Sequence, residues 1–278
     1  MKYSNFWYRK NRGLVVFLID QSNSMSASSL NRQSLAEIAA DAVNLMLNNF
    51  ILSSTSTDYD GDVKVKNRAT IVVIGYGGKD NDNAECLFCE SITKIDEDFP
   101  RVPINIAAKE GNVTLDCIQA LKSKVGYGTP MASAFKLAKD TVDTWISIHN
   151  NMNDPVPVVV NIAGSYPTDS EEDVRKYANE IKNMEIPDGN VLLFNVHIPR
   201  EIIFPANGEL MSDKITQLLC DISSNVSHDL IKNCYQSKSN IQPGSKLFIN
   251  TIYIMEHLFD KIDFLSYDGA VVSKMKCI

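Results

Sequence analysis

The chain has 278 residues, of which 44% are hydrophobic, so it can form one large α/β domain or two small ones. Its formal net charge is −7, and no stretch is densely basic, which argues against nucleic acid or an anionic membrane as its main partner. No apolar run approaches the roughly 18–20 residues of a membrane span, and six scattered cysteines suit a reducing compartment. We therefore expect a cytoplasmic protein.

The first half of the chain opens with a strand and a helix. Leu14–Ile19 is continuously apolar, which is typical of a strand buried on both faces, and Thr70–Tyr76 has the same character. Between them, Ser34–Phe50 carries apolar residues at steps of three and four, which predicts an amphipathic helix. The segment around 80–124 is less regular, and within it we expect a helix at Thr114–Lys122.

The second half of the chain repeats the alternation of helices and strands. Its predicted strands and helices, in chain order, are Pro130–Ile148 (helix), Val156–Ile162 (strand), Glu171–Met184 (helix), Val191–Val196 (strand), Ser212–Ser223 (helix) and Thr251–Phe264 (helix). This order predicts an α/β fold with a doubly wound, mostly parallel sheet flanked by helices. With no repeat and no linker, we expect a single domain over 1–278, with an insertion around 80–124 and a C-terminal helical extension from about 210.

Polar residues follow two of these strands and precede one helix. Asp20 ends the first strand and is followed by Ser22 and Ser24, Ala163-Gly164-Ser165 follows the third strand, and Thr129 lies at the start of the helix from Pro130. In open parallel sheets, such carboxyl ends form the ligand-binding edge. The side-chain oxygens of the first loop can bind a metal ion, and the same residue types also stabilise turns and helix starts.

The pattern D-x-S-x-S after a hydrophobic strand, with a distant G-x-T-P-M that opens a helix, resembles the von Willebrand factor A (VWA) domain. The resemblance implies a Rossmann-like fold with a metal-ion-dependent adhesion site, where a divalent cation bridges to an acidic group of a partner protein. It implies Asp20, Ser22, Ser24 and Thr129 as the residues around Mg²⁺ (or Mn²⁺ or Ca²⁺). It also implies an interaction module rather than an enzyme, with no catalytic residues.

One position departs from the family pattern. Ala163 stands where an aspartate is expected in the third loop, so the site carries one negative charge fewer and we expect weaker cation binding. Asp169, in the same loop, is either a compensating ligand or, as we favour, a residue that starts the helix from Glu171.

A second resemblance concerns the later part of the chain. Asn195-x-His197 followed by Ile202–Pro205, with Leu218–Ser224 further on, resembles uncharacterised bacterial cytoplasmic VWA proteins. This implies a role in bacterial signalling or in stress and conflict responses.

Other functions stay open at this stage. One is a VWA scaffold with a degenerate metal site that binds its partner by another surface. A less favoured one is a phosphatase with Asp20 as nucleophile, although Ser22 stands where such enzymes carry a second aspartate. Cys86 and Cys89 form one C-x-x-C without the second ligand pair that zinc usually needs, so we expect two ordinary thiols on a hairpin.

Overall fold

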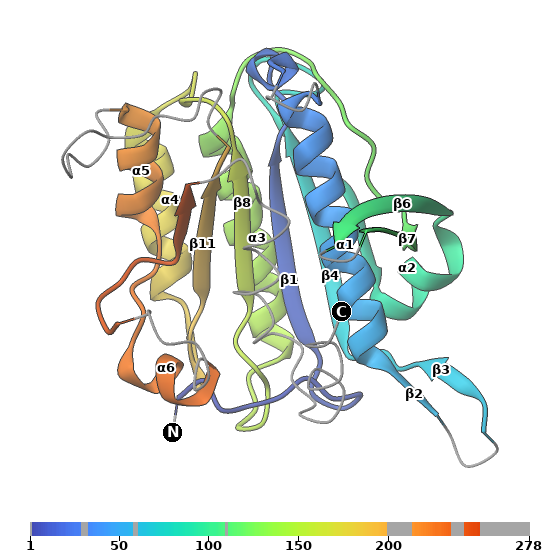
Figure 1. The fold of residues 1–278 in the computed structure, drawn as a ribbon. Coiled ribbons are helices and arrows are strands. Elements are labelled where there is room, and N and C mark those ends of the chain that lie inside the picture. Colours follow the sequence, from blue (N-terminus) through green and yellow to red (C-terminus); the bar gives the residue numbers. More distant parts are fainter. Residues whose placement is uncertain are drawn as a thin grey trace.

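The computed structural model describes residues 2–28, 33–57, 61–108, 111–198, 213–234 and 242–250. A six-stranded sheet forms the centre of the molecule, with the strand order β12-β11-β8-β1-β4-β5 (Figure 1). These strands are β1 (Gly13–Asp20), β4 (Ala69–Tyr76), β5 (Ala84–Ser91), β8 (Val158–Ala163), β11 (Leu192–His197) and β12 (Phe248–Asn250). Every neighbouring pair is parallel except β4 with β5, so the predicted mostly parallel sheet is confirmed.

The central strand β1 shows why the apolar runs form strands buried on both faces. All eight of its residues are buried. Val15, Phe17 and Ile19 contribute to one hydrophobic cluster, whereas Leu14 and its alternating neighbours contribute to the other. Because successive side chains point to opposite faces of a sheet, a strand with a core on each side must be apolar at every position.

Helices cover both faces of the sheet. The cluster on one face includes residues of α1 (Leu35–Ser54), α2 (Ile92–Asp98) and α6 (His228–Cys234). The cluster on the other face includes residues of α3 (Met131–Ile148), α4 (Glu171–Asn183) and α5 (Lys214–Ile222) (Figure 1). The chain thus leaves β1 over one face and later returns to β8 over the other, which is the doubly wound arrangement that the sequence predicts.

The long helix α1 begins with a capping box. The Ser34 side chain accepts a hydrogen bond from the Glu37 amide, and the Glu37 carboxylate accepts one from the Ser34 amide. Among the described residues, α1 is the one helix that is long and apolar enough to cross a membrane. Of its most apolar window, 78% is buried inside the protein, where the helix packs on the sheet.

The segment around 80–124 contains elements of two kinds. Its first strand, β5, belongs to the central sheet, and it is followed by α2. A separate hairpin of β6 (Arg101–Ala108) and β7 (Gly111–Ile118) then packs near α1. The expected helix at Thr114–Lys122 is therefore wrong. Apolar and polar residues alternate along β7, with Asp116 exposed and Cys117 buried, and this period of two is satisfied by strand pairing.

The remaining short elements lie at the periphery. They are η1 (Asn23–Ser26), the paired strands β2 (Thr55–Thr57) and β3 (Val63–Val65), and the paired strands β9 (Glu185–Ile186) and β10 (Gly189–Asn190). The C-terminal part that we expect to be helical contains α5 and α6, and also β12, which extends the sheet. The expected helix at Thr251–Phe264 and the stretch Ile202–Pro205 lie outside the described residues.

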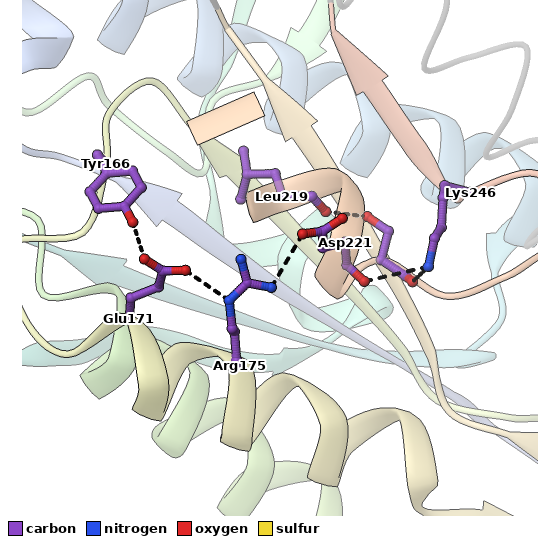
Figure 2. A network of polar contacts seen from close by, with 7 residues as sticks. Tyr166, Glu171, Arg175, Leu219, Asp221 and Lys246 are labelled. Carbon is purple, nitrogen blue, oxygen red and sulfur yellow. Dashed lines mark hydrogen bonds and ion pairs between the residues drawn. The ribbon is translucent and has the colours of Figure 1, made fainter. Parts of the chain in front are cut away.

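A polar network joins α4 to the end of α5 (Figure 2). The Tyr166 hydroxyl donates to Glu171, whose carboxylate pairs with Nε of Arg175 at 2.8 Å. Nη1 of Arg175 reaches the Asp221 carboxylate on α5 at 3.3 Å, and Nζ of Lys246 donates to the Asp221 carbonyl at 3.4 Å. The charged side chains of this network are partly exposed to solvent.

Candidate metal centre

The candidate site lies at the carboxyl edge of the sheet, where β1 and β8 run side by side. The chain leaves β1 toward one face and reaches β8 from the other, so the loops after these two strands diverge at this point. Such a switch point is where open α/β sheets bind ligands. Asp20 is the last residue of β1, and Gly164 and Ser165 follow the last residue of β8.

The segment before α3 is fixed against this edge by backbone hydrogen bonds. The amide of Gly126 donates to the carbonyl of Gln21 at 2.8 Å, and the amide of Asn23 donates to the carbonyl of Tyr127 at 2.8 Å. The amide of Tyr127 in turn donates to the carbonyl of Gly77 at 2.6 Å. The loops after β1 and β4 and the segment before α3 are thus joined by backbone hydrogen bonds.

Gly77 allows this close packing. Its φ of +79° lies in the left-handed region, and a Cβ at this position would lie 2.0 Å from the carbonyl oxygen of Gly128. No other residue fits there without moving the segment that carries Thr129.

Four side chains from three loops meet at the edge of the sheet. The Ser165 hydroxyl lies 3.0 Å from Oδ2 of Asp20, 3.0 Å from Oγ of Ser22 and 2.9 Å from Oγ1 of Thr129. We call Asp20, Ser22, Thr129 and Ser165 the oxygen cluster. Because a carboxylate only accepts, the single hydroxyl hydrogen of Ser165 goes to Asp20, and the other two hydroxyls donate to Ser165.

The Asp20 carboxylate is almost completely buried, with 1% of the residue exposed. Burial raises its pKa, and hydrogen bonds from Ser22, Gly164 and Ser165 act in the opposite direction. The amide of Ser22 donates to Oδ1 at 2.8 Å, and the amide of Gly164 donates to Oδ2 at 3.1 Å. Asp20 is thus held in place by neutral donors from both loops.

The hydroxyls of Ser22 and Thr129 are not used for helix capping. Ser22 precedes η1 but makes no side-chain capping bond to it, and Oγ1 of Thr129, before α3, bonds to Oγ of Ser165. The first turn of α3 is capped instead by Asp169, whose Oδ2 accepts from the amide of Ser133 at 3.2 Å. The two hydroxyls are therefore directed to the oxygen cluster, which weakens the interpretation of these residues as turn and cap residues alone.

Ser24 is the expected site residue that the structure does not bring into the oxygen cluster. It lies on η1 and is half-buried, and within the described part of the chain its hydroxyl has no hydrogen bond to Asp20, Ser22 or Thr129. The structure therefore joins three of the four expected residues and adds Ser165. A small polar residue just after a buried parallel strand is the sequence signal that points to Ser165.

Asp169 has a different role from the one expected. It caps α3, whereas the helix that begins at Glu171 is capped by Ser170. The expectation that Asp169 starts the helix from Glu171 is therefore wrong. Ser170 takes the capping position of that helix, and the Asp169 carboxylate bonds to α3, which begins 38 residues earlier in the chain. Its Oδ1 is buried and has no hydrogen-bond partner among the described residues.

Ala163 contributes no oxygen to the cluster. It is fully buried and belongs to the hydrophobic cluster that includes residues of α3. Ile19 lies opposite Ile162, so Asp20 and Ala163, which follow them, lie on this same face of the sheet. The loop after β8 reaches Asp20 through the Gly164 amide and the Ser165 hydroxyl instead.

The donor set fits a hard divalent cation. Hard ions such as Mg²⁺ prefer carboxylate, hydroxyl and water oxygens, and the oxygen cluster supplies one carboxylate and three hydroxyls within a buried site. Asp169 can supply a second carboxylate near the same edge, and its Oδ1 has no hydrogen-bond partner among the described residues. Burial raises the pKa of Tyr76, and the charges of Asp20 and Asp169 raise it further.

The comparisons with known proteins give likenesses of architecture only. No model of a known protein family matches the chain, and no curated protein matches it. Among solved structures, the SpRpn10 VWA domain aligns over 86% of this chain and 88% of its own, with 13% identity and a TM-score of 0.45. The pilus adhesin SpaC from Lactobacillus rhamnosus GG aligns over 94% of this chain, with 12% identity and a TM-score of 0.49.

A third solved structure is VWA2, an ArnB paralog from Sulfolobus acidocaldarius, which aligns over 68% of this chain with 13% identity and a TM-score of 0.35. This chain spans 35% of the length of VWA2 and 31% of the length of SpaC. The α/β fold of this chain is defined by its strand order and register.

Proposed function

We propose that this protein is a VWA-like protein-interaction module whose oxygen cluster holds a divalent cation. Asp20, Ser22 and Thr129, with Ser24 from η1 and Ser165 from the loop after β8, would surround Mg²⁺, or Mn²⁺ or Ca²⁺. The cation would bridge to an acidic side chain of a partner protein. We further propose a cytoplasmic role in bacterial signalling or in stress and conflict responses, on the resemblance described from the sequence.

The observation that carries this proposal is a group of three hydroxyls beside one buried carboxylate: Ser165 bonds to Asp20, and Ser22 and Thr129 bond to Ser165. The three hydroxyls come from three separate loops, and the two that could cap helices do not. A buried carboxylate held by neutral donors alone is costly, and a cation beside it would offset that cost.

The same chemistry favours binding over catalysis. Hydroxyl ligands are neutral, so they leave most of the cation's charge available for a carboxylate that a partner offers. Both oxygens of Asp20 accept hydrogen bonds from the protein, which makes it a poor base for activating water. A phosphatase with Asp20 as nucleophile is not supported either, because Ser22 takes the position of the second aspartate and bonds to Ser165.

Titration calorimetry with MgCl₂ and MnCl₂ tests the cation. We expect saturable binding that is lost in Ser22→Ala and in Thr129→Ala. Ser26→Ala serves as the matched control, because Ser26 lies on η1 with its hydroxyl bonded to the carbonyl of Asn23. Equal binding by Ser22→Ala and the unmodified protein would contradict the proposal.

The bridge to a partner is tested separately. Capture of a protein from the native host with the immobilised chain should be lost on adding a chelator and in Ser22→Ala. Capture that survives both treatments would contradict the ion bridge, even where the protein binds the cation.

A second candidate is a scaffold whose metal site is degenerate. It is favoured by one observation: hydrogen bonds within the protein already engage Asp20, Ser22 and Thr129, through the Ser165 hydroxyl and the amides of Ser22 and Gly164. In this case calorimetry gives no heat of binding with either cation, and partner capture is insensitive to the chelator.

A further inference from the structure

The edge strand β5 contains a β-bulge between its two cysteines. In the antiparallel pairing with β4, Val73 lies opposite Phe88 but the next residue, Ile74, lies opposite Cys86, so Leu87 is the extra residue. A bulge of this kind changes the faces to which the following side chains point. In a regular strand, residues three positions apart point to opposite faces of the sheet.

The bulge places Cys86 and Cys89 on the same face. Cys89 lies opposite Val72 and Cys86 lies opposite Ile74, and both of these β4 residues belong to the cluster on the α3 side. Leu87 and Phe88, by contrast, both pack against the cluster on the α1 side. The two apolar side chains between the cysteines thus face one core together, and both thiols are left exposed on the other face.

The spacing of the two thiols suits a shared ion better than a disulfide. Their partners on β4 are two residues apart, which is about 6.8 Å along an antiparallel strand. A disulfide needs Cβ atoms only about 3.5–4.5 Å apart, so it would require the backbone to move. Two metal–sulfur bonds of about 2.3 Å let the sulfurs remain up to about 4.6 Å apart, and rotation about χ1 brings neighbouring thiols toward each other.

The surroundings do not favour a reactive thiol. Burial raises the pKa of Cys86 and that of Cys89, and the neighbouring Cys89 raises that of Cys86 further. Nucleophilic and redox-active cysteines instead have lowered pKa values, set by nearby positive charges or helix N-termini.

We propose that Cys86 and Cys89 form a two-thiolate site for a soft, monovalent d¹⁰ ion such as Cu⁺, on the exposed face of β5. Soft thiolates select such ions over the hard cations that suit the oxygen cluster, and two ligands are sufficient for a monovalent d¹⁰ ion, whereas zinc usually takes four. Each thiol loses its proton on binding, so one ion displaces two protons. This site is independent of the proposed function of the oxygen cluster.

The test is an anaerobic titration of the fully reduced protein with Cu⁺, delivered as a complex with a colorimetric chelator that competes for it. We expect one tightly bound ion per chain. Cys86→Ser and Cys89→Ser should each weaken this binding by more than about a hundredfold, beyond what loss of an outer contact costs. Cys220→Ser, which alters a partly exposed cysteine on α5, should leave it unchanged.

A rearranged pair tests the geometry itself. Glu90 follows Cys89 directly and lies opposite Ile71, which belongs to the cluster on the α1 side, so the double variant Cys89→Ser/Glu90→Cys keeps two cysteines in β5 on opposite faces. It should bind Cu⁺ as weakly as the single variants, while far-UV circular dichroism confirms that it is folded. Unchanged binding in Cys86→Ser or in the rearranged pair would overturn the proposal. So would ready formation of a Cys86–Cys89 disulfide with oxidised glutathione, seen as a loss of two mass units.

Discussion

The Ser165 hydroxyl lies 3.0 Å from Oδ2 of Asp20, although the two residues are 145 positions apart in the chain. This contact joins the loop after β8 to the loop after β1 at the switch point of the sheet. It also identifies Ser165 as the residue of the third loop whose side chain reaches Asp20, and therefore as a position where a substitution can alter the charge of the site.

Replacing Ser165 by aspartate is the sharpest test of that relationship. In Ser165→Asp a second carboxylate stands next to that of Asp20, and at an effective dielectric constant near 20 two such charges about 4 Å apart repel by up to about 4 kcal/mol. We expect a lower melting temperature without added metal. We also expect Mg²⁺ to bind at least about tenfold more tightly, which is about 1.4 kcal/mol, and to restore the lost stability.

The outcome separates the two proposed functions. A degenerate site predicts that Ser165→Asp is destabilised and that Mg²⁺ does not rescue it. Ser165→Ala serves as the uncharged control. It loses the hydrogen bond to Asp20 and those from Ser22 and Thr129, should cost about 2–4 kcal/mol, and should not gain metal affinity. Calorimetry and thermal unfolding with and without MgCl₂ measure both effects.

The strands that pack on both faces could be predicted from the sequence because their signal is local. A run such as Leu14–Ile19 is apolar at every position, and only burial on both faces accounts for it. The alternating stretch within Thr114–Lys122 is short, and there a helical spacing and a strand spacing cannot be told apart without the pairing partner β6.

The candidate site could be predicted only where the motif is contiguous. Asp20 and Ser22 are two residues apart, so one loop contains both. Ser165 joins them from another strand, and Asp169 caps α3 rather than the helix beside it in sequence. Contacts of this kind depend on which strands are neighbours in the sheet, and no local sequence pattern predicts that strand order.

A buried chain of polar side chains crosses the sheet, and it gives the second prediction. Tyr76 donates to Asn161 at 3.1 Å, Asn161 donates to Asn195 at 2.9 Å, and Asn195 donates to Ser223 at 3.0 Å, all of them essentially inaccessible to water. Asn161→Ala leaves two buried groups without partners, which should lower the free energy of unfolding by about 3 kcal/mol. Urea denaturation measures this.

The matched control for that variant is Arg175→Ala. It removes the centre of the network in Figure 2, where the Arg175 side chain is 40% exposed. Surface ion pairs of this kind contribute less than about 1 kcal/mol and are screened by salt. Similar losses in the two variants would show that the buried chain does not contribute as argued.

The third prediction concerns how the β6–β7 hairpin is attached. The side chain of Asn44 on α1 donates to the Leu121 carbonyl and accepts from the Leu121 amide, each at 2.8 Å, and the residue is buried. Asn44→Ala leaves both backbone groups of Leu121 unpaired, which should cost about 2–4 kcal/mol. Asn49→Ala, at a half-buried position on the same helix, should cost much less in the same denaturation experiment.

The capping box of α1 gives a prediction about pH. Hydrogen bonds from the backbone amide and the hydroxyl of Ser34 lower the pKa of Glu37 below its ordinary value of 4.5. Because the folded pKa is the lower one, the stabilisation is fully present above the unfolded value and is lost as the pH falls through the folded pKa. The difference in unfolding free energy between the unmodified protein and Glu37→Ala should therefore be largest near neutral pH.

That difference should be a few tenths to about 1 kcal/mol, as for an exposed acidic side chain in the first turn of a helix, and it should shrink as the pH falls below about 4. Ser34→Ala is the comparison. The Ser34 hydroxyl also accepts a hydrogen bond from the Glu37 amide at 3.2 Å, and that bond does not depend on the charge of Glu37. Ser34→Ala should lower the free energy of unfolding by about 1 kcal/mol, and part of this loss should persist in acid. A Glu37→Ala difference that stays constant from neutral to acidic pH would show that the carboxylate charge plays no part in the start of α1.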